Sequence, residues 1–171
     1  MKRLIVVSLL ILVAAAAYRS FGSAETATGS LTLAQPAPAP GDRAPEFTTR
    51  TEGGEPFTLT DNGVYVLAFW STLNLGSNKA EPGFKELAEE YDNDEVSFAA
   101  VYMNGAPKDY EAPYAMLRDG NGKLASKYNV KRVPRLFLIK GGRVELVLNG
   151  YYEGSEEDLE DALQNAVENG S

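Results

Sequence analysis

The stretch Val-Tyr-Val-Leu-Ala-Phe-Trp at residues 64–70 is almost entirely apolar. An apolar run of this length is typical of a β-strand that is buried on both faces of a sheet. The turn residues Asp61-Asn-Gly63 precede this run and separate it from a short strand pattern, Phe57-Thr-Leu59. We therefore expect residues 64–70 to form the central strand of the fold.

Helix and strand patterns alternate after this run. Residues 79–91 place apolar side chains at helical spacing, and residues 96–103 (VSFAAVYM) form a second apolar run. The turn residues 92–94 lie between these segments, so the second strand is expected to return parallel to the first. Residues 104–113 contain two prolines and a glycine and predict a loop.

The remainder of the chain predicts a short helix, a hairpin and a final helix. Residues 123–128 fit the short helix, and Gly141-Gly142 turns the chain between strands at 135–140 and 144–148. Ser155 is placed to cap a last helix whose acidic first turn suits the helix dipole. This order predicts an α/β fold with a mixed central sheet and helices on both faces.

The composition excludes several classes of function. The 171 residues include no cysteine and no histidine. Cysteine nucleophiles, Ser-His triads, haem attachment and zinc sites built from nitrogen or sulfur ligands all need one of these residues. The formal net charge is -8, so nucleic acid is a poor partner. We expect no cofactor and no metal site, and we interpret Asp119-Gly-Asn-Gly122 as a plain turn.

The sequence divides into three regions. Residues 1–24 read as a signal peptide or an N-terminal membrane anchor, because Lys2-Arg3 precede an apolar stretch at residues 4–17. That stretch is shorter than the roughly 20 residues of a typical spanning helix, yet it leaves a membrane tether open. Residues 25–40 form a linker rich in Pro and Ala, and residues 41–171 form the domain. We expect an extracytoplasmic protein, either secreted or anchored through its N-terminus.

Four stretches that occur in a fixed order carry a family resemblance. They are Gly41-Asp-Arg-Ala-Pro-Glu-Phe47, Val66-Leu-Ala-Phe-Trp-Ser-Thr72, Asp119-Gly-Asn-Gly-Lys-Leu-Ala125 with Tyr128-Asn-Val130, and Val133-Pro134. Together they resemble the thioredoxin-like superfamily, and most closely the exported redoxin group of TlpA-like and ResA-like thiol-disulfide proteins, which is related to the AhpC/TSA proteins. The resemblance covers residues 41 to about 168 and implies a thioredoxin-like fold.

The resemblance fails at the centre of the family's active site. The family pattern is W-x-x-x-C-x-x-C-x-x-x-x-P; Trp70 and Pro82 match it, but Asn74 and Ser77 stand at the two cysteine positions. Thiol-disulfide exchange and peroxidase chemistry both need a thiolate, so we expect neither and assign no catalytic residue. Ser77 with Lys79 would be an alternative nucleophile and base, but a role for Ser77 as a helix cap is favoured.

The resemblance also implies that a binding groove remains without the thiols. In the family, a cis X-Pro bond offers backbone groups to an extended substrate segment, and the Val133-Pro134 bond is similar to it. The residues expected to line an apolar groove with a few polar groups are Trp70, Leu73, Asn74, Leu75, Val133 and Pro134. This predicts a non-catalytic module that binds an extracytoplasmic protein or peptide.

Two other functions stay open. One is an accessory component of an extracytoplasmic thiol-disulfide or antioxidant pathway that supplies no thiol itself. The other is a small-molecule binder or an unrecognised enzyme. An apolar surface patch around Trp70 would favour protein binding, whereas a closed pocket with convergent polar groups would favour a small molecule.

Overall fold

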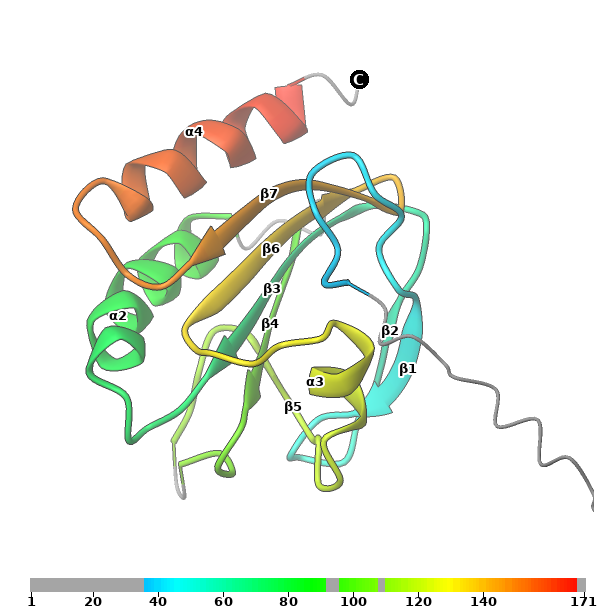
Figure 1. The fold of residues 1–171 in the computed structure, drawn as a ribbon, viewed down its shortest axis with the longest axis vertical. Coiled ribbons are helices and arrows are strands. Elements are labelled where there is room, and N and C mark those ends of the chain that lie inside the picture. Colours follow the sequence, from blue (N-terminus) through cyan, green and yellow to red (C-terminus); the bar gives the residue numbers. More distant parts are fainter. Residues whose placement is uncertain (1–35, 92–95, 108–109, 169–171) are drawn as a thin grey trace, which may run out of the picture. The chain divides into compact units, whose positions relative to one another are not determined.

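Strand β3 (Val64–Trp70) lies at the centre of a five-stranded sheet in the computed structural model, which describes residues 36–91, 96–107 and 110–168 (Figure 1). It pairs in parallel with β4 (Val96–Tyr102) and antiparallel with β6 (Arg135–Lys140). The outer strands are β5 (Ala115–Leu117) and β7 (Arg143–Asn149), which gives the order β5-β4-β3-β6-β7. The expected central strand and mixed sheet are confirmed.

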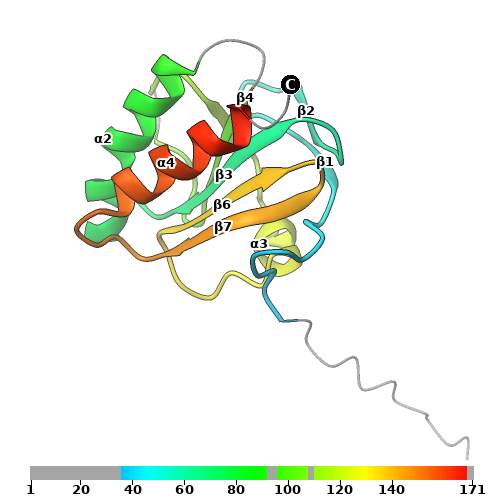
Figure 2. The same ribbon diagram turned by 90° about the horizontal axis from the view of Figure 1, so that it is seen from above.

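Helices cover both faces of this sheet. Helices α2 (Leu75–Glu90) and α4 (Ser155–Glu168) pack on one face, where they run beside each other (Figure 2). Helix α3 (Lys123–Lys127) packs on the other face. A two-stranded antiparallel sheet of β1 (Phe47–Arg50) and β2 (Pro56–Leu59) shares that second face. The α/β fold class predicted from the sequence is therefore confirmed.

The alternation of side chains along β3 builds the two cores. Val66, Ala68 and Trp70 belong to the core beneath α2 and α4, whereas Leu67 and Phe69 belong to the core on the α3 side. All of these side chains are buried. A strand with apolar residues on both faces is stable only inside a layered structure, which is why the sequence run at 64–70 decides the fold.

The structure corrects several predicted boundaries. Helix α2 begins at Leu75 rather than residue 79, because Asn74 caps it. Strands β1 and β5 were not predicted; β5 has only three residues and depends on its pairing with β4. Ser155 is the first residue of α4 rather than its cap, since the Gly154 carbonyl accepts the hydrogen bond from Asp158 N.

The last residues of the predicted linker, 36–40, belong to the described part of the chain. Pro38 is buried, and the backbone N–H of Ala39 donates to Asp42 Oδ2 at 2.9 Å. The end of the predicted linker therefore packs against the domain. The rest of the linker and the predicted leader at residues 1–24 lie outside the described residues. Of the helices in the described ranges, none has the length and apolar character needed to span a membrane.

The contribution of Tyr128 to the stability of the core on the α3 side can be measured. Its ring is fully buried, and its hydroxyl donates to the Pro45 carbonyl at 2.9 Å. Burial raises the pKa of Tyr128 above its ordinary value of 10.0. The folded state thus keeps a proton that the unfolded chain releases at high pH. The stability that protonated Tyr128 contributes is therefore complete below about pH 10 and declines at higher pH.

We expect Tyr128→Phe to lower the free energy of unfolding by about 1 kcal/mol at neutral pH, because one buried hydrogen bond is lost. We also expect the variant to lose less stability than the parent between about pH 9 and about pH 11. Urea unfolding followed by circular dichroism measures both effects, with Tyr151→Phe as the control at an exposed ring. Equal alkaline losses in parent and Tyr128→Phe would contradict this account.

Candidate functional site

Several loops meet at one end of the five-stranded sheet. In the strand register, Trp70 pairs with Tyr102, Phe69 with Arg135, and Arg135 with Asn149. Strands β3, β4 and β7 therefore finish, and β6 begins, along the same edge (Figure 1). We call this edge and its loops the site end. It contains both positions that match the family cysteines and the Val133-Pro134 bond.

Asn74 caps helix α2 at the site end. Its side-chain Oδ1 accepts a hydrogen bond from Ser77 N at 2.9 Å, and its carbonyl accepts one from Asn78 N at 3.1 Å. Asn is among the best residues at this position, since it satisfies amides that the helix itself leaves unpaired. The residue at the first cysteine position therefore has a structural role.

Ser77 is buried inside the first turn of α2, with 2% of its surface exposed. Its Oγ accepts from Ser71 N at 3.2 Å and lies 3.5 Å from Asn74 Oδ1. The prediction that Ser77 caps the helix is wrong, because Asn74 occupies that position. A solvent-facing nucleophile paired with Lys79 has no support here, because the hydroxyl is enclosed and Lys79 is exposed.

Polar contacts hold the loop that joins β3 to α2. Thr72 N donates to Asn104 Oδ1 at 3.1 Å, and Asn104 Nδ2 donates to Thr72 Oγ1 at 2.6 Å. The side chain of Asn78 adds a bond to the Thr72 carbonyl at 3.3 Å. With its backbone fixed in this way, the loop leaves Leu73 86% exposed and Leu75 79% exposed.

Trp70 does not line a groove, contrary to the prediction. Only 1% of its surface is exposed, and its ring packs edge-on against Phe84 with centroids 5.2 Å apart. The reason is its register on β3, which aims Trp70 at the core beneath α2 together with Val66 and Ala68. Trp70 supports the site end from below and cannot touch a ligand.

The Val133-Pro134 peptide bond is cis, and Pro134 lies against the start of α2. A Cβ placed on Gly76 would come within 3.1 Å of both Pro134 Cδ and Asn74 Oδ1, so the two loops touch. Gly150 N donates to the Pro134 carbonyl at 2.9 Å, which joins the loop after β7 to the same cluster. The structure thus brings Asn74 close to Pro134 at the start of α2, while the groove itself stays a prediction.

Val133 is half-buried, and its backbone polar groups face no partner. Among the described residues, no hydrogen bond engages the Val133 N–H or carbonyl. Backbone groups without a partner are paired with solvent or with a ligand, because leaving them unpaired is costly. An extended segment lying along residue 133 would pair with them.

A buried polar cluster supports α2 from below. Tyr102 Oη donates to Glu81 Oε1 at 2.7 Å, Tyr114 Oη lies 3.0 Å from the same oxygen, and the two hydroxyls are 3.0 Å apart. Burial raises the pKa of both tyrosines well above the ordinary range. Both hydroxyls therefore stay protonated at neutral pH and hold Glu81 of α2 by hydrogen bonds.

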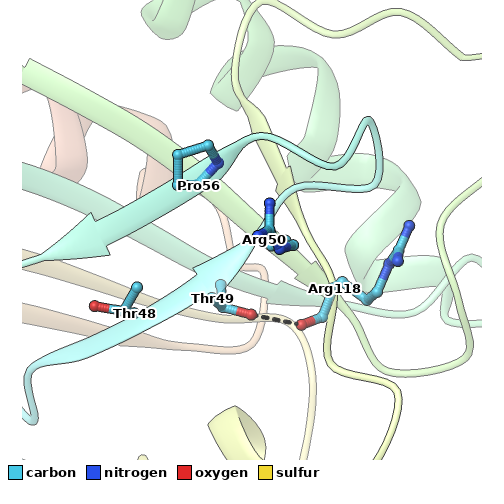
Figure 3. Close-up of a pocket in the computed structure, with 5 residues that line it drawn as sticks. All are labelled: Thr48, Thr49, Arg50, Pro56 and Arg118. Carbon is cyan, nitrogen blue, oxygen red and sulfur yellow. Dashed lines mark hydrogen bonds between the residues drawn. The ribbon is translucent and has the colours of Figure 1, made fainter.

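A hollow lies beside β1 and β2, and none of the predicted site residues lines it (Figure 3). Its volume is about 420 Å³, and Arg50 and Arg118 line it with Thr48, Thr49 and Pro56. Both arginines are already engaged: Arg50 Nη1 donates to the Gly54 carbonyl at 2.7 Å, and Arg118 Nε lies 3.4 Å from Glu52 Oε2. Arg118 is thus paired with a carboxylate, whereas Arg50 is bonded to a backbone carbonyl, and we assign no ligand to this hollow.

The remaining acidic positions do not gather into a metal centre. Within the described ranges, no group of three or more Asp or Glu side chains is arranged to hold a metal ion. Asp119, the first residue of the predicted turn, accepts hydrogen bonds from Leu124 N and Ala125 N at 3.0 and 3.1 Å. Its carboxylate thus stabilises the start of α3.

The fold and the site end define a thioredoxin-like protein whose two thiol positions hold Asn74 and Ser77. Residues 40–147 match the AhpC/TSA family, and the chain belongs to that family. No curated protein matches the sequence.

Solved structures of thiol-disulfide proteins share the fold. A putative thiol:disulfide interchange protein DsbE from Chlorobium tepidum is 25% identical with a TM-score of 0.67, over 77% of this chain and 99% of that one. StoA from Bacillus subtilis is 21% identical with a TM-score of 0.59, over 72% and 99%. A secreted disulfide oxidoreductase from Mycobacterium tuberculosis is 22% identical with a TM-score of 0.57, over 70% and 95%.

The double variant Asn74→Cys, Ser77→Cys tests whether the site end has kept the geometry of the lost dithiol. We expect it to form a reversible disulfide and to reduce a small disulfide reagent, whereas the parent does neither. The backbone N–H of residue 77, which now donates to the Asn74 side chain, would stabilise a thiolate at position 74 and place its pKa below the ordinary value of about 8.5. Mass spectrometry of the oxidised and reduced forms, with pH-dependent alkylation, measures both properties.

The single variant Asn74→Cys is the matched control, because it gains a thiol at the helix start without a resolving partner. It should be alkylated but form no internal disulfide. A double variant that folds, as shown by circular dichroism, and yet stays fully reduced under an oxidant would show that the geometry has been lost.

Proposed function

We propose that this chain is a non-catalytic, extracytoplasmic thioredoxin-like module that binds an extended segment of a protein or peptide at its site end. The chain has the fold of thiol-disulfide proteins but no cysteine, so it supplies no thiol for exchange. The extracytoplasmic location is supported by the apolar stretch at residues 4–17 and by a structural relative that is described as secreted.

One observation carries the proposal: large exposed apolar side chains gather at the site end. In the described part of the chain, such side chains occur only in the loops that follow β3, β4 and β7 and at the first residue of α2. These residues are Leu73, Leu75, Met103, Tyr151 and Tyr152. Apolar groups concentrated at one end of a soluble domain mark a surface that is covered by a partner.

The free backbone of Val133 indicates the shape of that partner. An extended segment would exchange backbone hydrogen bonds with residue 133 and lay its side chains over Leu73 and Leu75. Main-chain bonds of this kind supply affinity, and the exposed leucines supply an apolar anchor. No step of this binding needs a thiol.

The family favours a second candidate, an accessory component of a thiol-disulfide or antioxidant pathway. In that role the same surface would dock on an active thiol protein. The small-molecule alternative has less support, because none of the exposed apolar side chains lines the cavity beside Val133-Pro134. Residues 4–17 would tether either module to a membrane if they are retained.

The first test is selection from a random, cysteine-free peptide library displayed on phage, with the full chain as bait. We expect binders whose affinity falls at least about tenfold in the double variant Leu73→Ser, Leu75→Ser, since two exposed apolar contacts are lost. Isothermal titration with synthetic copies of the selected peptides measures the dissociation constants.

The matched control is Leu73→Met, Leu75→Met, which keeps both side chains apolar and should keep binding within about threefold. Both variants change exposed residues, so circular dichroism should show an unchanged fold. If no peptide is selected, or if the serine variant binds as well as the methionine variant, the site end is not the binding surface.

A further inference from the structure

A cavity lies directly beside the Val133-Pro134 bond. Its volume is about 570 Å³. Residues 131–135 form one wall, and the end of β7 forms the other. The residues that line it are Lys131, Arg132, Val133, Pro134, Arg135, Asn149 and Gly150. Three of the seven are cationic, in a protein whose formal net charge is -8.

None of these three cations forms an ion pair within residues 36–91, 96–107 and 110–168. The ion pairs found in the described residues use Arg43, Lys85 and Arg118. None of them involves Lys131, Arg132 or Arg135, although acidic residues are in excess. Uncompensated positive charge at one cavity, within an acidic protein, would attract an anion from outside.

Arg135 is the most constrained of the three cations. Its guanidinium lies over the Phe137 ring at 5.2 Å from the centroid, and its Nε is buried without a hydrogen-bond partner among the described residues. Burial lowers the pKa of Arg135, because removing the guanidinium from water disfavours its charged form. A carboxylate at the remaining guanidinium nitrogens would favour that form.

We propose that this cavity binds the carboxylate of an Asp or Glu in the partner segment, so that the partner is both acidic and apolar. The proposal rests on the function proposed above and adds a charge requirement to it. The segment would lie along Val133, place its acidic side chain toward Lys131, Arg132 and Arg135, and place apolar side chains on Leu73 and Leu75. Charge complementarity at an exposed part of an interface mainly sets the association rate of the complex and the dependence of its affinity on salt.

The test uses the peptides selected by the parent chain. We expect them to carry Asp or Glu at a fixed distance from an apolar residue. Lys131→Gln with Arg132→Gln should weaken binding about fivefold, as should an Asp→Asn or Glu→Gln change in the peptide. Combining the protein and peptide changes should weaken binding little more than either change alone, because both changes remove the same contact. Raising the salt concentration should weaken peptide binding to the parent more than peptide binding to the variant that carries Lys131→Gln and Arg132→Gln.

The matched control is Lys123→Gln with Lys140→Gln, which removes the same charge from positions outside the cavity. It should change the dissociation constant by less than about twofold. A separate competition experiment adds inorganic phosphate to the complex and compares it with sodium chloride of equal ionic strength. If phosphate displaces the peptide or binds alone with a comparable affinity, the cavity is a site for a free anion and the peptide-carboxylate proposal is wrong.

The outcomes separate this proposal from the proposed function. If selected peptides depend on Leu73 and Leu75 but show no acidic preference, and the charge variant binds as the parent does, the acidic requirement is wrong while peptide binding stands. If no peptide binds at all, both the acidic requirement and the proposed peptide binding are wrong. Arg135 is left unchanged in these variants, because its contact with Phe137 makes a loss of fold harder to separate from a loss of binding.

Discussion

Strand β3 is the constraint on which the other features depend. It is paired along its length with β4 on one side and β6 on the other, and its two faces anchor two separate cores. Because β3 ends at Trp70, in register with Tyr102, the neighbouring loops must leave the sheet at that edge. The apolar loops, the cis-proline and the cationic cavity meet there as a result of this pairing.

The same geometry explains how the chain tolerates the absence of both thiols. Asn74 supplies an oxygen to an amide at the start of α2, and Ser77 supplies a small buried hydroxyl to Ser71 N. Asn is a strong capping residue, so the helix start is stabilised without a cysteine. The scaffold around this edge is thus intact, while thiol-disulfide exchange there is excluded by the absence of cysteine.

Much of the fold could be predicted, because long apolar runs and turn residues mark β3, β4, β6 and β7. Strand β5 could not, since three residues carry no periodicity and pair only because β4 is present. The capping preference of Asn74 indicates the start of α2, but the glycine in Leu75-Gly76 is unfavourable in a helix and hides that start in the sequence. The family motif alone does not show that Trp70 is buried, because that follows from its register on β3, where it shares a face with Val66 and Ala68.

The central claim is that the site end binds an extended segment although the thiols are gone. Amide chemical-shift mapping of the isotope-labelled chain, titrated with a peptide selected by the parent, tests it most directly. The account predicts shifts at Leu73, Leu75, Val133 and Gly150, with slower hydrogen exchange at the Val133 amide once the peptide is bound. Shifts centred instead on the hollow beside β1 and β2, or an unchanged Val133 amide, would contradict it.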